Sequence, residues 1–430
     1  MAPLGVCIMS QIMVHQSKNK HFKTFEQQST AVMHRLRASL SVLIGAVPST
    51  EELRKATDLQ KALGIGNTLA WQVYKLAHAR DPLVEASSVP GAGGMKRLFE
   101  AAAQHGVPAK HIEDSVAAIK EFDELVKFHA GDRMAFDSMI SGMTEEGAQL
   151  VDAQQKRAAF RANSHLWGLQ ARTQLKCTIL NQSLDSTTNL DLAQLQGYVN
   201  LRRFRQAIPL LISDIQLIKD DEHKHNILPP YRRESLAGDG ATTQGAPLLK
   251  KFCSQPPPEI RTIRSEAGDV QTELVACGVG NESAVTFMFG DVVRSVPGPY
   301  AGDAPPGLRS HAWVRVPAEV LIQDVLIHED VFGSLTTKTT VFGDHNRSPA
   351  SSTFDLSGAS LLGTKESTVY MGKGPTALQT PDVPRYPDMA EYAFDRLGWD
   401  GEKFDVYRCR VEYPVMPSAV VMHFDLPEKP

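Results

Sequence analysis

The stretch that decides the interpretation of this chain is LQKALGIGNTLAWQVYKLA, residues 59–77. Its apolar residues recur at spacings of three and four on both sides of Gly64, which predicts two amphipathic helices joined by a tight turn. Gly64 marks the turn, because glycine adopts the left-handed backbone that ends many helices. Aligned on this glycine, the residues expected to be buried between the two helices are Leu59, Leu63, Ile65, Ala70 and Val73, with Leu76 extending the stripe.

The opposite side of the second helix is expected to be polar and outward-facing. Asparagine and glutamine side chains can pair bidentately with adenine, while lysine can reach guanine or a phosphate. Basic residues around such a helix would add affinity that does not depend on base sequence. The outward set is Gly66, Asn67, Thr68, Trp71, Gln72 and Lys75, and the surrounding basic set is Arg54, Lys55, Lys61, His78 and Arg80.

Residues 50–82 resemble the helix-turn-helix domain of bacterial transcriptional regulators, and the resemblance covers 30–82 if the preceding helix completes a three-helix unit. It implies that the second helix lies in the major groove of double-stranded DNA. One such helix buries little DNA surface, so we expect a homodimer. Two residues depart from the family pattern. Gln60 replaces a small residue, and the bulky Trp71 either faces DNA or packs against a neighbouring domain.

Charge is distributed unevenly along the chain. Residues 1–80 hold ten Lys and Arg against four Asp and Glu, whereas the whole chain of 430 residues has a net charge of −4. A basic segment on an acidic body is the pattern of a nucleic-acid-binding module. Solvated helix faces also gather Lys and Arg, so the same pattern fits a protein whose helical hairpin is purely structural.

The chain is predicted to be α+β, with an all-helical N-terminal part, a small α/β segment and a β-rich C-terminal domain. Met33, Leu36, Leu40 and Leu43 mark the inner face of the helix that precedes the hairpin. The predicted boundaries are a disordered leader at 1–25, a helical domain at 26–168 with the helix-turn-helix at 56–77, a strand-helix-strand segment at 169–227 with its helix over 190–201, a Pro/Gly-rich linker at 228–260, and the β-rich domain at 261–430.

Several classes of protein are disfavoured by what the sequence lacks. There is no run of 18 apolar residues, so we expect no transmembrane helix and no membrane partner. The first 25 residues lack the basic and continuous apolar regions of a signal peptide. Five scattered cysteines without a CxxC spacing favour a reducing cytoplasm over a disulfide framework or a zinc ribbon; they are Cys7, Cys177, Cys253, Cys277 and Cys409.

Other constellations are weaker candidates. GAGGMKR, residues 91–97, could hold an anion with Lys96 and Arg97, but it lacks the spacing of a phosphate loop. The segment 154–172 interleaves basic residues with Phe160 and Trp167, and it fits a connecting helix, a dimer contact or a second nucleic-acid surface. Residues of metal-ligating type gather without a convincing ligand spacing at His223 and His225, at His328, Glu329 and Asp330, and at Asp344 and His345.

Three functions therefore stay open. The sequence favours a cytoplasmic DNA-binding transcriptional regulator with a C-terminal domain for sensing or assembly, no catalytic residues and no cofactor. The alternative is a non-enzymatic interaction or assembly protein, and the third is a metal-dependent β-barrel enzyme. The operator sequence and any small-molecule effector stay open.

Overall fold

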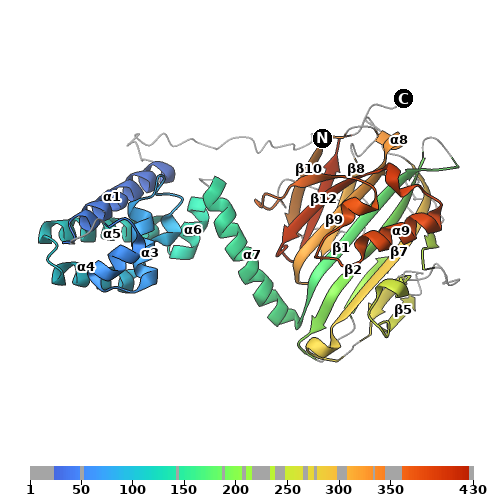
Figure 1. The fold of residues 1–430 in the computed structure, drawn as a ribbon, viewed down its shortest axis with the longest axis horizontal. Helices are drawn as coiled ribbons and strands as arrows, with labels where there is room; N and C mark the ends of the chain where they lie inside the picture. The colour runs from blue at the N-terminus through green and yellow to red at the C-terminus, as the bar shows by residue number, and fades with distance from the viewer. Residues whose placement is uncertain are drawn as a thin grey trace, which may run out of the picture. The chain divides into compact units, whose positions relative to one another are not determined.

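The computed structural model separates into two compact units, residues 1–151 and 152–430, and each unit has its own apolar core (Figure 1). The predicted leader at 1–25 lies outside the described residues apart from Thr24 and Phe25. The structure describes residues 24–48, 53–141, 145–185, 189–205, 210–215, 233–237, 247–264, 270–275, 278–297, 308–332, 335–343 and 361–425.

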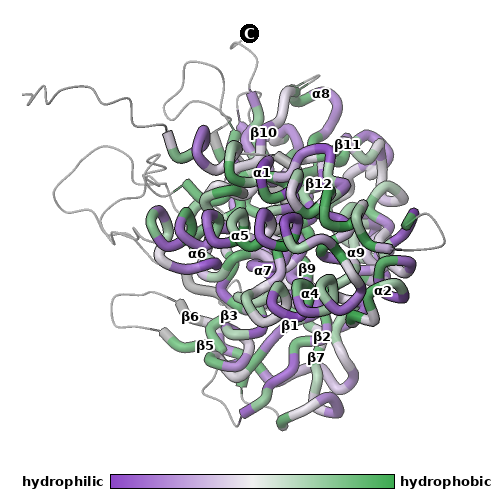
Figure 2. Tube along the Cα trace, turned by 90° about the vertical axis from the view of Figure 1, so that its left-hand side faces the viewer, coloured by the Kyte–Doolittle hydropathy of each residue, from purple (hydrophilic) through white to green (hydrophobic). Residues whose placement is uncertain are grey.

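The regular secondary structure described in unit 1 is all helical. Thr24 caps the first helix through a capping box with Gln27. Hydrophilic and hydrophobic residues alternate along the first and fifth helices (Figure 2), as expected of helices that bury one face. The helices are α1 (Phe25–Gly45), α2 (Ala56–Leu63), α3 (Asn67–Ala77), α4 (Ala92–Gln104), α5 (Ala109–His129) and α6 (Arg133–Ser141); α7 (Glu145–Trp167) begins in unit 1 and ends in unit 2.

The core of unit 1 forms around α1. This helix runs antiparallel to α5, because Gln28 at its start bonds His129 and Arg35 pairs with Glu121 further back along α5. The stripe predicted from the sequence is completely buried: Met33, Leu36, Leu40 and Leu43 have no exposed surface. Removal of this apolar area from water is the main contribution to the stability of the unit.

The tight turn after α2 depends on Gly64. This residue caps the helix with φ 60° and ψ 26°, in the left-handed region, as the sequence predicts. The Cβ of an alanine there would have no atom within 4 Å, so the substitution would lose stability through backbone strain and not through a steric clash. We expect Gly64→Ala to lower the free energy of unfolding of unit 1 by about 1 to 2 kcal/mol. Urea denaturation followed by the fluorescence of Trp71 measures this loss.

The matched control is Gly93→Ala in the first turn of α4. This position also has open space around a new Cβ but ordinary helical geometry. The change should be neutral or slightly stabilising, because alanine is the better helix former. Equal destabilisation by the two substitutions would show that the left-handed backbone at Gly64 is not the cause.

Unit 2 is built on one large sheet with the strand order β11-β12-β9-β1-β2-β7-β4. Neighbouring strands are antiparallel except β1 and β9, which run parallel from Ala171 beside Ala318 to Leu180 beside Ile327. The strands are β1 (Leu169–Gln182), β2 (Asn189–Arg203), β4 (Arg233–Ser235), β7 (Val285–Pro297), β9 (Ala318–His328), β11 (Thr368–Lys373) and β12 (Phe404–Glu412).

The large sheet is covered on both faces. Helix α9 (Tyr386–Leu397) lies across one face, over β1 and β2 (Figure 1), and buries Met389, Ala390 and Phe394 against it. The other face packs on a second sheet of order β10-β13-β8, with strands β8 (Leu308–Val314), β10 (Thr337–Gly343) and β13 (Ser418–Phe424). A third sheet, of order β3-β6-β5, consists of β3 (Leu210–Ile215), β5 (Ile260–Arg264) and β6 (Val270–Leu274); the short helix α8 (Glu329–Phe332) follows β9.

The structure is α+β, as predicted, but it contradicts the predicted strand-helix-strand segment. Residues 190–201 belong to strand β2, and every second residue from Asp191 to Leu201 is buried. The leucines and valine of this stretch lie mostly two and four residues apart, so they fit a strand as well as a helix. Gly197 is consistent with a strand, because a Cβ there would lie 2.1 Å from the carbonyl oxygen of Phe287 on β7.

The predicted boundaries change accordingly. Strands β1 and β2 pair with β9 and β7, so the two strands share one sheet with the β-rich part and form no separate segment. The predicted linker at 228–260 contains β4, which pairs with β7, and Leu248, which bridges Phe289. In the described ranges, none of the helices combines the length and the apolar character needed to cross a bilayer.

Candidate nucleic-acid interface

The helix pair α2–α3 is held by the residues expected from the sequence. Leu59, Leu63 and Ile65 are at most 9% exposed, and Ala70, Val73 and Leu76 are completely buried. They join the apolar core that α1 forms with α5. Gln60, at a position where a small residue was expected, is only half-buried, so its length is accommodated at the edge of the pair. The packing fixes the orientation of α3 within unit 1.

The outward side of α3 is accessible. Gly66, Asn67 and Thr68 are exposed at its N-terminal end, and the side chains of Gln72 and Lys75 are half-buried further along. Trp71 has half of its surface exposed (51%). The indole is therefore not part of the core of unit 1. An exposed tryptophan on a polar helix face is a candidate contact for a partner.

Lys75 is already engaged within unit 1. Its Nζ lies 2.7 Å from a carboxylate oxygen of Glu85 and 4.9 Å from the centre of the Trp71 ring. The ion pair partly neutralises the lysine, and the cation–π contact orients the indole. Glu85 was not identified from the sequence as a neighbour of α3, and no local spacing links the two.

Two of the flanking basic residues, Arg54 and His78, are joined to α3 through Tyr74. The hydroxyl of Tyr74 donates to the carbonyl oxygen of Arg54 at 2.5 Å, and its ring stacks on His78 with centroids 4.0 Å apart. Tyr74 thus ties the segment before α2 to the end of α3. The i, i+4 spacing of Tyr74 and His78 was a signal for this contact. Lys55, Lys61 and Arg80 are also exposed.

A surface cleft of about 480 Å³ lies between the N-terminal end of α3 and helix α4. Asn67 and Thr68 line it on one side, and Arg97, Glu100 and Gln104 line it on the other. Helix α3 follows Gly66, which supplies no side-chain cap, and its first turn has no acidic residue. The first amide groups of α3 and the guanidinium of Arg97 therefore offer hydrogen-bond donors on the same cleft.

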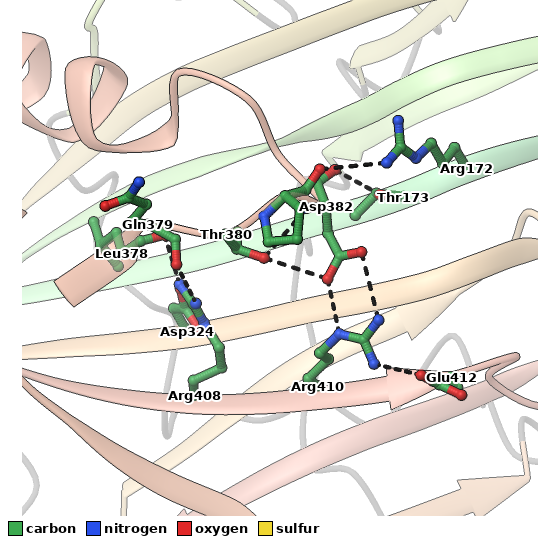
Figure 3. A network of polar contacts seen from close by, with 11 residues as sticks. Arg172, Thr173, Asp324, Leu378, Gln379, Thr380, Asp382, Arg408, Arg410 and Glu412 are labelled. Carbon is green, nitrogen blue, oxygen red and sulfur yellow. Dashed lines mark hydrogen bonds and ion pairs between the residues drawn. The ribbon is translucent and has the colours of Figure 1, made fainter. Parts of the chain in front are cut away.

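A polar network in unit 2 holds the segment 378–382 against the sheet (Figure 3). Arg408 and Asp324 form two hydrogen bonds, at 2.8 and 2.9 Å, in the interior of the unit. The Arg408 guanidinium also donates to the carbonyl oxygen of Leu378 at 3.0 Å. Burial raises the pKa of the Asp324 carboxyl, and the guanidinium opposes this shift. Asp324 has no exposed surface and Arg408 is 6% exposed, so the pair is part of the core.

A second branch of the network lies nearer the surface. Asp382 accepts a hydrogen bond from Arg410 at 2.8 Å, and its carbonyl oxygen accepts one from Thr173 at 2.8 Å. Arg410 also donates to Glu412 at 2.7 Å (Figure 3). The two contacts of Asp382 join loop to strand, which is the role expected of a structural network, whereas the Arg410–Glu412 contact lies within β12.

The cysteines of the sheet are not placed for catalysis. Cys177 and Cys409 are buried, and burial raises the pKa of each thiol to about 12. Both therefore stay protonated at neutral pH, whereas a nucleophilic cysteine reacts as the thiolate. Cys253 is half-buried and is not in a disulfide.

The metal-binding candidates receive no support from the residues that the structure describes. No group of three or more His, Cys, Asp or Glu side chains among them could hold a metal ion. Near His328, the Glu329 carboxylate is occupied by Lys373 at 2.6 Å. His223, His225, Asp344 and His345 lie outside the described residues.

Comparisons with known proteins add little to this geometry. No protein-family model and no curated protein sequence matches the chain. A solved structure of a "putative protease" from Parabacteroides distasonis is similar at 9% identity and a TM-score of 0.23; the match covers 60% of this chain and spans 40% of the length of that protein. A similarity at that level carries no argument about fold or activity.

Proposed function

We propose that this protein binds double-stranded DNA through α3 and regulates transcription as a cytoplasmic homodimer. The observation that carries the proposal is the combination of a buried inner face and an accessible polar outer face on α3. Leu59, Ala70 and Val73 fix the helix, while Asn67 and Thr68 stand exposed at its N-terminal end. The N-terminal residues of a recognition helix are those that reach base edges in the major groove.

The proposed contacts divide into two kinds. Asn67 and Gln72 would read bases, because an amide can pair bidentately with adenine. The hydroxyl of Thr68 and the uncapped amide groups at the start of α3 would donate hydrogen bonds to a DNA phosphate, with Arg97 on the same cleft. The remaining phosphate contacts would come from the exposed basic residues, which are Arg54, Lys55, Lys61, His78 and Arg80.

Lys75 is assigned a smaller part than the sequence suggested. To reach a base it would have to leave Glu85 and the face of Trp71, and both contacts oppose this movement. The base-reading role therefore rests mainly on Asn67 and Gln72, and Lys75 with Trp71 forms the edge of the surface.

We expect the double substitution Asn67→Ala and Gln72→Ala to weaken specific DNA binding by about thirtyfold or more, since each of the two lost bidentate contacts costs about 1 to 3 kcal/mol. The probe is a duplex selected from a random-sequence pool by the unmodified chain. Its affinity is measured by mobility shift at several salt concentrations, because phosphate contacts make binding weaken as salt rises.

Two matched controls accompany this test. Gln155→Ala removes an exposed amide from α7 and should leave affinity unchanged. Lys61→Ala should weaken binding to every sequence, whereas Lys120→Ala, which changes another exposed lysine on α5, should not. If the unmodified chain selects no duplex and shifts none at low ionic strength, the proposal is wrong.

An assembly function is the second candidate, and one observation favours it. The half-exposed Trp71 held against Lys75 resembles the aromatic anchor of a protein interface. Under this alternative, Trp71→Ala should reduce the oligomeric mass measured by light scattering, and neither the unmodified chain nor any variant should bind DNA. If Asn67→Ala/Gln72→Ala instead loses DNA affinity while its oligomeric mass is unchanged, the regulator is supported.

A further inference from the structure

The corner of unit 2 where α7 meets β1 exposes several large side chains. Leu166 and Trp167 at the end of α7 are 70% and 60% exposed, and Phe204 just after β2 is 43% exposed. Arg202 and Arg205 flank Phe204. We call these five residues the aromatic corner.

The aromatic corner is held together by the backbone. The amide of Phe204 donates to the carbonyl oxygen of Gly168 at 2.7 Å, so the end of β2 lies against the turn that follows Trp167. Gly168 has φ 68°, and a Cβ there would lie 3.1 Å from Cδ of Arg205. The arginine side chain thus covers the glycine. The aromatic residues and the arginines therefore share one small area in the folded unit.

The chain segments that form the aromatic corner are rich in basic residues and contain no acidic ones. Residues 153–184 contain five Lys and Arg and no Asp or Glu, and residues 192–213 contain three Arg and no acidic residue. Arg202 donates to the amide oxygen of Asn281 at 2.7 Å rather than to a carboxylate. Within the described part of the chain, neither Arg202 nor Arg205 forms an ion pair, whereas Arg261, Arg294 and Arg410 of the same unit do.

The chemistry that fits both features is a polyanion with flat apolar faces. The guanidinium of Arg202 lies 5.5 Å from the centre of the Phe204 ring, so charge and ring face are presented together. Bases of a single strand can stack on exposed aromatic rings while arginines contact the phosphates. A duplex hides its base faces inside the helix, and an acidic peptide offers charge with few flat faces.

We propose that the aromatic corner binds single-stranded nucleic acid. Trp167 and Phe204 stack on bases, and Arg202 and Arg205 contact the backbone. This activity goes beyond the proposed function, because its residues belong to unit 2 and none of them is in the helix pair of unit 1. Stacking is tolerant of sequence, so a strand of any composition that can unstack should bind.

The test uses the full chain and a fluorescently labelled dT20 strand, with binding followed by anisotropy. Trp167→Ala should weaken binding about tenfold, as should Phe204→Ala. Arg205→Ala should lower the salt dependence of binding by about 0.7 in the log–log slope. Tyr370→Ala and Arg396→Ala remove an exposed aromatic and an exposed arginine elsewhere in the unit, and they should have no effect.

A second measurement locates the stacking residue without weakening it. In a Trp71→Phe chain, dT20 should still quench tryptophan emission, and adding Trp167→Phe should remove most of the quenching while anisotropy still shows binding. Quenching that is lost with Trp71→Phe alone would overturn the proposal. So would binding of poly-glutamate as tight as that of dT20, or dT20 affinity that is unchanged by Trp167→Ala.

The two proposals fail separately. If Asn67→Ala/Gln72→Ala loses duplex binding and keeps dT20 binding, the result concerns the proposed DNA site of unit 1 alone. If Trp167→Ala loses dT20 binding and keeps duplex binding, the result concerns the aromatic corner of unit 2 alone.

Discussion

Replacing Arg408 by methionine should lower the free energy of unfolding of unit 2 by about 3 to 5 kcal/mol, which is the cost of leaving a buried charge without its partner. Asp324 has no exposed surface, and the two hydrogen bonds from Arg408 are its ion-pair contacts. The same change also removes a donor from the carbonyl oxygen of Leu378. Urea denaturation in a Trp71→Phe background measures the loss, because the remaining tryptophans all lie in unit 2.

Two further variants test the cause. Adding Asp324→Leu to Arg408→Met removes the orphaned carboxylate and should recover much of the lost stability. Arg261→Met breaks a surface pair with Glu273 and should cost less than about 1 kcal/mol. If Arg408→Met costs no more than Arg261→Met, the interior pair does not hold the segment 378–382 as described.

Acidification from pH 6.5 to pH 4 should destabilise unit 2 by up to about 3 kcal/mol through His311. Burial, and to a smaller extent the nearby His423, Lys176 and Arg309, together lower the pKa of His311 to about 4. A histidine that stays neutral in the folded state contributes fully above its unfolded pKa of 6.5. Below that value the unfolded chain takes up the proton first, so stability is lost until the pH reaches the folded pKa.

The measurement is urea denaturation of the Trp71→Phe chain at pH 7, 5.5 and 4.5. His311→Gln should flatten the pH dependence over this window, because glutamine does not titrate. His165→Gln, at an exposed position on α7, should leave the dependence as it is. An unchanged profile in His311→Gln would assign the acid sensitivity to other groups.

The sequence predicts the fold best where a single period governs a segment. Leu36, Leu40 and Leu43 follow a helical period alone, so both the helix and its buried face could be predicted. The stripe in β2 could not be assigned, because Leu195 and Val199 are four residues apart and an even spacing fits strand and helix alike. Only the pairing of β2 with β1 and β7 decides the matter, and that pairing is not encoded locally.

The sequence likewise predicted only those features of the candidate site that follow from local periodicity. The alignment on Gly64 identified which residues of α3 face inward, because burial follows from periodicity. It could not identify Glu85 as the partner of Lys75, or Arg97 as a neighbour of Thr68, because those contacts depend on how α3 packs against later segments. Arg408 and Asp324 are separated by 84 positions in sequence, and no spacing rule joins them.

The order of strands in the large sheet has a consequence for synthesis. Strand β1 is made early in unit 2, yet its parallel neighbour β9 begins at Ala318, and β9 gains its second neighbour only with Phe404–Glu412. A chain emerging from the ribosome therefore carries the apolar residues of β1 unpaired on one side for a long interval, while unit 1 already holds every helix of its core. The yield of folded protein should therefore depend on the supply of chaperones that protect the unpaired edge of β1. Slower elongation between residues 182 and 318 should lower that yield, because it prolongs the exposure of this edge.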